Sequence, residues 1–352
     1  MTEDFRDVLL AGGARFGPLM ARDELLDFGD PEREYEAARS AAALLDLSDR
    51  GKLDVLGGDR ARFLNGQVSN DVLAPKPGEG CRAALLDRQS HVLAELRVYA
   101  LEDRIEVDLD RYALDRTAQR LARYVLASDV RLHDRTAELG LFSLQGPLAS
   151  ALAERLTGVS AVGLAEYGHL GATFQKRPVR LRRSSRAASL GVDILHPADA
   201  SLPLWRALVE AGAVPAGLTA MEAARIEAGI PRYGADVTES HLVQEAAYPD
   251  AVSFTKGCYT GQEVVARVRS RGHVNRLRCG LVVDGPALPG DEVRAEGQRI
   301  GEITSSAHSP RLGATVCQAT LKARWAQMDG AAVTVHGREG EAAGKVSAFP
   351  MG

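Results

Sequence analysis

The chain has 352 residues, of which 45% are hydrophobic and 26% charged, values typical of a folded protein with two or three domains. This composition excludes disorder on compositional grounds. The 43 basic and 47 acidic residues nearly cancel to a formal net charge of -4. That balance excludes a global field that would draw the protein onto nucleic acid or an anionic membrane.

The sequence predicts a cytosolic protein that does not associate with membranes. Its acidic N-terminus lacks the basic start and apolar core of a signal peptide, and no uncharged apolar run approaches the roughly 20 residues that span a bilayer. A reducing compartment would leave the cysteines as thiols; they are Cys81, Cys258, Cys279 and Cys317. No Cys-x-x-Cys and no paired histidine spacing occurs, so a built-in metal site is disfavoured, although ligands from distant segments or two chains stay possible.

The first half of the chain alternates between helical and extended patterns. Apolar stripes of helical period predict helices at 33–45 and 111–127. Asp59 is a candidate cap for a short helix through Phe63 and Leu64. Alternating or continuous apolar runs predict strands at 52–56, 82–87, 91–100, 104–109 and 140–145. Gly146-Pro147 then begins the next helix.

In the second half, the pattern changes near residue 275 from mixed helices and strands to short strand-like runs. An arginine-rich, strand-like segment at 171–200 precedes predicted helices at 202–212 and 218–229, and Thr219 and Glu222 have capping-box spacing. Gly-bearing turns then separate short apolar runs at 277–283, 299–304, 312–320 and 332–336, which predict a small barrel or sandwich. We therefore expect an N-terminal extension at 1–32, a main body at 33–272 and a C-terminal β domain at 273–352.

One segment, Lys256 to Glu263, has the composition of a functional loop. Glycines on both sides of Cys258 indicate a tight turn where the backbone approaches another group closely. A nearby cation such as Lys256 would favour the thiolate, which is the reactive and metal-ligating form. The alternative is structural, because a lone cysteine is more often a small buried hydrophobe than a nucleophile.

The same segment resembles the signature Lys-Gly-Cys-aromatic-x-Gly-Gln-Glu of YgfZ-type proteins at every fixed position. Further segments resemble the wider glycine-cleavage T-protein (aminomethyltransferase) superfamily and occur in the order of that family: 45–48, 52–55, 63–72, 143–147 and 222–231. The resemblance covers roughly residues 33 to 350. It implies an α+β fold, with a multi-lobed folate-binding body, a central cleft for the folate pterin and a C-terminal β-barrel-like domain.

The resemblance also implies roles for individual residues. Cys258 would be the catalytic group, as thiolate or transient ligand, and Lys256 would lower its pKa or hold an anionic partner. Tyr259 could stack on an aromatic ligand, with loop packing as the alternative, and Gln262 and Glu263 would shape the loop. Two further candidates for contact with the folate cofactor lie outside the loop, at Arg225 and Asp108. The alternatives are an ordinary surface ion pair of Arg225 with Glu222 or Asp236, and an ordinary exposed strand-end aspartate at Asp108.

Two departures from the T-protein pattern bear on activity. Ala94-Glu95 replaces the acidic pair of true T-proteins, and the glutamate that binds the pterin is absent near Asp193. A pterin needs a carboxylate opposite its donor edge, because a buried unpaired donor costs about 1–3 kcal/mol. Asp193 or Glu95 could substitute.

The resemblance therefore implies a tetrahydrofolate-binding protein that supports assembly or repair of iron–sulfur clusters in client proteins, including tRNA-modifying enzymes. Whether it is an enzyme is left open, and the two departures argue against a true aminomethyltransferase. One alternative is a folate-dependent aminomethyltransferase or methyltransferase, and another is a folate-independent interaction protein. Direct binding of nucleic acid is not expected, because the basic stretch from Arg177 to Arg186 is interpreted as a solvated strand edge.

Overall fold

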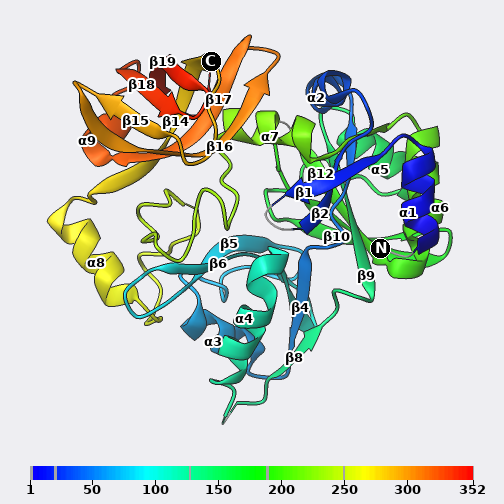
Figure 1. The fold of residues 1–352 in the computed structure, drawn as a ribbon. Coiled ribbons are helices and arrows are strands. Elements are labelled where there is room, and N and C mark those ends of the chain that lie inside the picture. Colours follow the sequence, from blue (N-terminus) through cyan, green and yellow to red (C-terminus); the bar gives the residue numbers. More distant parts are fainter. Residues whose placement is uncertain (1–2, 20–21, 127, 188–189, 249, 352) are drawn as a thin grey trace.

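The computed structural model describes residues 3–19, 22–126, 128–187, 190–248 and 250–351. These residues form two lobes, each built on a β-sheet with flanking helices, and a closed barrel at the upper left of Figure 1. Within the described ranges, no helix is long and apolar enough to cross a membrane.

The first lobe is an antiparallel five-stranded sheet in the order β5-β6-β7-β4-β8. Its strands are β4 (Gly51–Leu56), β5 (Gly80–Leu86), β6 (Val92–Ala100), β7 (Arg104–Leu109) and β8 (Arg131–Asp134). Two helices, α3 (Arg60–Gln67) and α4 (Arg111–Ala122), belong to the same lobe. The helix predicted at 111–127 therefore ends five residues early at Ala122, and residue 127 lies outside the described ranges.

The second lobe is a six-stranded sheet in the order β10-β11-β12-β9-β3-β13. Its strands are β3 (Ala43–Asp46), β9 (Leu139–Gln145), β10 (His169–Phe174), β11 (Arg177–Arg183), β12 (Gly191–Pro197) and β13 (Val214–Pro215). Its helical elements are α2 (Pro31–Ser40), α5 (Ala149–Thr157), η1 (Ala198–Ala200) and α6 (Ser201–Glu210).

The prediction of a helix at 33–45 is wrong for the residues after Ser40. Helix α2 ends at Ser40, and residues 43–46 form strand β3 instead. Strand β3 pairs with β9 in the buried centre of the sheet, where Leu44 is fully buried. Tertiary pairing therefore overrides the local helical stripe.

The arginine-rich segment is not a solvated strand edge, so that prediction is wrong. Strand β11 lies between β10 and β12, and the Arg182 side chain is buried. Its Nη2 lies 2.5 Å from Glu106 Oε2, which belongs to β7 of the first lobe. Arg180 and Arg182 face inward because Glu106 of the other sheet provides a partner for their charges.

The N-terminal segment packs into the second lobe. It comprises α1 (Glu3–Ala11) and the hairpin of β1 (Arg15–Leu19) and β2 (Arg22–Asp27), while residues 1–2 and 20–21 of the predicted extension lie outside the described ranges. Phe5 is buried, and its ring centroid lies 5.6 Å from that of Trp205 on α6. The hairpin thereby stands beside the cavity described below.

Helix α7 (Leu218–Glu227) lies between the second lobe and the barrel (Figure 1). The capping box predicted from Thr219 is not formed, because the N-cap is Gly217. A Cβ at Gly217 would lie 2.3 Å from the backbone of Leu26, so only glycine allows this close approach of β2. The carboxylate of Glu222 is thereby left for partners in the cavity.

The C-terminal lobe is a closed barrel in the order β14-β17-β16-β15-β18-β19. Its elements are β14 (Arg276–Asp284), β15 (Glu292–Ala295), β16 (Gln298–Ser309), β17 (Ala314–Lys322), α9 (Ala323–Ala326), β18 (Ala332–Gly337) and β19 (Gly340–Ser347). Helix α8 (Gln262–Arg271) precedes it. The predicted α+β fold class with a C-terminal barrel is confirmed.

A pH titration of stability tests the contact between the two lobes. Burial alone would raise the pKa of Glu106, but the charges of Arg182, Arg180 and Arg104 outweigh it and lower the pKa to about 2. A depressed folded-state pKa gives stability that is full above the ordinary value of 4.5 and is lost as pH falls towards 2. We expect a loss of about 3 kcal/mol over this window, measured by urea unfolding.

Substitution of the carboxylate provides the control for that titration. Glu106→Gln should have a lower free energy of unfolding than wild type at neutral pH. This difference should become smaller as the pH falls, because the lost charge matters only while Glu106 of wild type is ionised. The exposed Glu102→Gln should follow wild type at every pH. If the difference in free energy of unfolding between Glu106→Gln and wild type stays the same down to about pH 2, Glu106 is not the group that loses its ion pair in acid.

Candidate functional site

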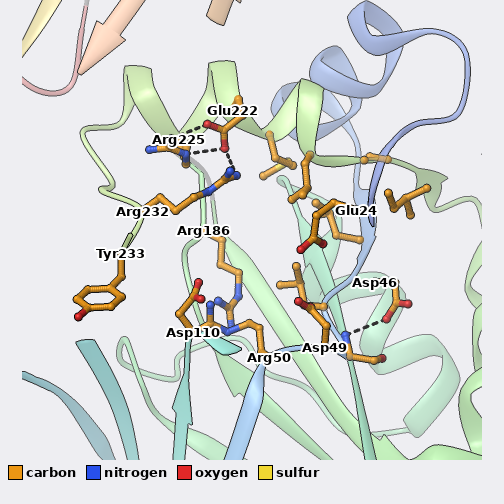
Figure 2. Close-up of a pocket in the computed structure, with 18 of the residues that line it drawn as sticks. Glu24, Asp46, Asp49, Arg50, Asp110, Arg186, Glu222, Arg225, Arg232 and Tyr233 are labelled. Atoms are coloured by element: carbon orange, nitrogen blue, oxygen red, sulfur yellow. Dashed lines mark hydrogen bonds and ion pairs between the residues drawn. The ribbon is translucent and has the colours of Figure 1, made fainter. Parts of the chain in front are cut away.

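A cavity of ≈ 360 Å³ lies where the two lobes, the β1–β2 hairpin and α7 meet (Figure 2). This volume falls within the range of small-molecule sites in proteins. Apolar side chains from the hairpin, from β3 and the segment after it, and from α7 form part of its wall: Phe16, Leu25, Leu45, Leu47, Leu218 and Met221. The remaining wall carries both carboxylates and guanidinium groups, so the cavity suits a ligand with an apolar body and polar ends.

The roof of the cavity is built on α7 and centres on Arg225. Its Nε and Nη2 donate to the two oxygens of Glu222, at 2.7 and 2.5 Å. The remaining donors go to the Asp236 carboxylate, the Ile230 carbonyl and the Ser305 hydroxyl. Both ion pairs considered from sequence are therefore present. All five N–H groups are used, so a direct contact with a ligand carboxylate would require Arg225 to release a protein partner.

Glu222 is the roof group that Arg225 positions. It lines the cavity and also accepts a hydrogen bond from Arg232. Figure 2 shows Glu222, Arg225 and Arg232 on one side of the cavity, opposite Arg50 and Arg186. Two arginines thus hold one carboxylate in a fixed orientation.

The floor consists of Arg50, at the start of β4, and Arg186, after β11. Arg50 Nε lies 2.5 Å from Asp108 Oδ1, and Arg186 Nη2 lies 2.8 Å from Asp108 Oδ2. Arg186 also pairs with Asp193 at 2.6 Å. These arginines hold the pKa of Asp108 well below its ordinary value despite burial. Asp108 and Asp193 thus lie beneath the floor, and neither is among the described residues that line the cavity.

Asp110 is the aspartate of this strand end that does line the cavity, and the sequence analysis did not select it. It caps α4 by accepting a hydrogen bond from the Tyr112 backbone N–H at 3.0 Å. Burial raises its pKa more than the charge of Arg50 lowers it. The signal in the sequence was its position just before a helix, which is typical of an N-cap.

Glu95 supplies a further carboxylate to the cavity from β6. Arg82 Nε donates to it at 2.9 Å, and the Tyr248 hydroxyl lies 3.4 Å away. Burial alone would raise the pKa of Glu95, but the charges of Arg82 and Arg97 outweigh it and lower the pKa. Glu95 is therefore a carboxylate at neutral pH and acts as an acceptor. Of the two substitutes considered from sequence, Glu95 faces the cavity and Asp193 does not.

The cysteine loop lies apart from the cavity. Cys258 is exposed, and the lining residues of the cavity within the described chain do not include it or any other loop residue. Tyr259 is buried in the core of the first lobe, which is the loop-packing alternative. Gln262 and Glu263 begin α8 and lie outside the lining as well. The other cysteines are at least partly buried, and burial raises the pKa of each to about 12.

Lys256 anchors the cysteine loop to the first lobe. Its Nζ donates to three backbone carbonyls at the C-terminal end of α3 and just beyond it, those of Asn65 at 2.6 Å, Val68 at 2.8 Å and Asn70 at 2.6 Å. Burial lowers the pKa of Lys256 to about 8. An ammonium group has three N–H donors, so Lys256 has none left for an anionic partner while this anchor is intact.

Metal ligation was also considered from sequence. Within the ranges that the structure describes, no group of histidine, cysteine and acidic side chains is arranged to hold a metal ion.

Comparison with known families shows the family to which the chain belongs. It matches the GCVT N-terminal domain over residues 5–256 and the glycine cleavage T-protein C-terminal barrel domain over residues 276–351. The protein belongs to the glycine cleavage T-protein family, and the predicted superfamily is confirmed. The narrower YgfZ-type branch stays a prediction.

Similar proteins span almost the whole chain. An aminomethyltransferase of Streptomyces avermitilis is 30% identical over 354 residues, covering 96% of this chain and 94% of the relative. A chloroplastic protein of Arabidopsis thaliana that is named as a transferase is 25% identical over 304 residues, covering 86% and 69%. The crystal structure of glycine cleavage system aminomethyltransferase T from Bartonella henselae has a TM-score of 0.90 at 23% identity, covering 99% and 97%. This last likeness establishes the T-protein fold.

Removing the lysine anchor tests the structural role of Lys256. Lys256→Met leaves three buried carbonyls without a donor, which should cost about 1–3 kcal/mol in the free energy of unfolding measured with urea. Cys258 should also react faster with a thiol reagent in the folded state, because the loop is released. Lys345→Met, at an exposed strand position, is the matched control. Unchanged stability with slower thiol labelling would show that Lys256 instead activates Cys258 as a nucleophile.

Proposed function

We propose that the protein is a cytosolic folate protein that binds tetrahydrofolate in the cavity between the two lobes. The observation that supports this proposal most is that carboxylates and guanidinium groups line the cavity together with an apolar wall. A reduced folate has the matching parts, namely an N–H donor edge on its pterin, an aromatic middle and a carboxylate tail. Bound tetrahydrofolate would supply the atoms that carry a one-carbon unit.

The residues present fit such a ligand. Among the several carboxylates that line the cavity, Asp110 and Glu95 are the ones that we assign to accept from the pterin donor edge. The raised pKa of Asp110 shows that its charge is under-compensated, so a ligand donor would favour the ionised form. Arg50 and Arg186 are the floor cations suited to the tail carboxylates, because guanidinium groups bind carboxylates in a bidentate manner.

For the activity, we favour folate-dependent transfer of a one-carbon unit, as an aminomethyltransferase or methyltransferase. Relatives that align over nearly the whole chain are named aminomethyltransferases. Glu95 lines the cavity and belongs to the Ala94-Glu95 pair that replaces the acidic pair of the T-protein pattern. Its role in this chain is to accept a hydrogen bond and to orient the ligand, because the neighbouring arginines keep it ionised.

Support of iron–sulfur clusters in client proteins, including tRNA-modifying enzymes, is the second candidate. The observation in its favour is the exposed thiol of Cys258 in a loop that matches the YgfZ-type signature and is anchored by Lys256. In this candidate, the cavity holds tetrahydrofolate while Cys258 meets the client at the surface. The two candidates thus share the folate site and differ in the use of the thiol.

Calorimetry with tetrahydrofolate tests the folate site. Wild type should bind, and Asp110→Asn should bind about tenfold more weakly, because loss of one charged acceptor costs about 1.4 kcal/mol. Asp115→Asn, on the exposed face of the adjacent helix, should leave the affinity unchanged. Absence of binding by wild type would favour the third alternative, a folate-independent interaction protein.

The role of Cys258 separates the two activities. In an assay of one-carbon transfer from a lipoylated carrier protein to tetrahydrofolate, Cys258→Ala should retain wild-type turnover, because the thiol lies outside the cavity lining. Glu95→Gln should reduce turnover on the order of tenfold if its charge orients the ligand. No turnover by wild type, together with loss of complementation by Cys258→Ala in a strain lacking a relative, would favour the cluster-support candidate.

A further inference from the structure

Arg97 differs from the other arginines of the cavity because it has no carboxylate partner. Within the described ranges, each of the other arginines that line the cavity forms an ion pair with an aspartate or a glutamate; they are Arg6, Arg50, Arg186, Arg225 and Arg232. The one side-chain hydrogen bond that joins Arg97 to the described part of the chain is donated by Nη1 to the Ser184 hydroxyl. The protein therefore leaves part of the Arg97 guanidinium without a partner.

The remaining donors of Arg97 open onto the cavity. Only 8% of the residue is exposed, yet it lines the cavity from β6. Its Nε and Nη2 form no hydrogen bond with a described residue, and neither atom is among the sealed polar atoms that lack a partner there. Both atoms are therefore accessible. A guanidinium group that loses water in a filled cavity needs an acceptor in exchange, so we expect the ligand to supply one.

Glu95 is the neighbour of Arg97 on this wall of the cavity. The two residues lie two positions apart on β6, and alternate residues of a strand point to the same face, about 7 Å apart. Both line the cavity. Burial alone would raise the pKa of Glu95, and the charge of Arg97 is, after that of Arg82, the strongest of those that lower it. An acceptor, Glu95, and a donor, Arg97, thus lie side by side.

We propose that Arg97 selects the 4-oxo group of the pterin, an inference that rests on the folate site proposed above. The pterin of tetrahydrofolate presents N–H donors and, directly beside them, the carbonyl oxygen of its 4-oxo group. Glu95 accepts from the donors, and Nε or Nη2 of Arg97 donates to the carbonyl oxygen. A pterin with a 4-amino group presents a donor at the same place, so the donors of Arg97 lose their acceptor. Arg97 is thus a specificity-determining residue.

The tail carboxylates of the folate suit Arg97 less well than the 4-oxo group does. Arg97 lies next to Glu95, which accepts from the donor edge of the pterin, whereas the aromatic middle of the folate separates that edge from the tail. Arg50 and Arg186, on the floor, remain the cations for the tail.

Calorimetry with two pterins that lack the tail tests this proposal. The probes are 6-methyltetrahydropterin, which has the 4-oxo group, and its 2,4-diamino counterpart, at a pH at which both are uncharged. Wild type should bind the 4-oxo compound roughly ten- to hundredfold more tightly. Arg97→Met should bind both equally. Arg97→Gln should lose the preference but keep most of the affinity for the 4-oxo compound, because an amide can either donate or accept.

The control is Arg131→Met, at an exposed position on β8 of the same sheet, which should keep the wild-type preference. Circular dichroism should show that all variants are folded. If wild type binds neither compound nor tetrahydrofolate, the folate site itself is wrong. If wild type binds both compounds equally, or Arg97→Met keeps the preference, the folate site stands and the role of Arg97 is wrong. Weaker binding of tetrahydrofolate alone by Arg97→Met would assign Arg97 to the tail and overturn the inference.

Discussion

Buried ion pairs between β7 and the arginines that face it hold the two lobes together and form the cavity floor. Glu106 of β7 pairs with Arg182 of the other lobe. Two residues further along the same strand, Asp108 pairs with Arg50 and Arg186. Loss of one partner from a buried pair leaves an uncompensated charge that costs about 3–5 kcal/mol. The position of the floor and the docking of the lobes therefore depend on the same charges.

Helix α7 connects this floor to the barrel. Arg225 joins the cavity carboxylate Glu222 to Asp236 and to Ser305 of β16. Two residues later, Glu227 accepts hydrogen bonds from Tyr35 of α2 and Ser309 of the barrel. The same helix therefore forms the roof of the cavity and contacts the barrel. A ligand that moves Glu222 would act on the barrel through Arg225.

The sequence indicated most elements of this fold but only part of the site. Strands such as β6 and β7 were predicted nearly in full because apolar and polar residues alternate along much of each, which is the period of a strand. The cysteine loop was found from its spacing, and Cys258 is exposed as a reactive thiol requires. Asp110 was missed in favour of Asp108, because the sequence does not show which of two aspartates at a strand end faces the cavity.

By itself, the sequence determined the fold class, the barrel and the glycine-flanked thiol, because periodicity and short motifs are local properties. Tertiary structure alone decided where the charges lie. Arg182 is buried against Glu106, and Lys256 is fully used by three carbonyls, although both are hydrophilic in sequence. It also decided that the thiol and the cavity are separate. The physical reason is that a charge is stable in the interior only beside its partner, and those partners are distant in the chain.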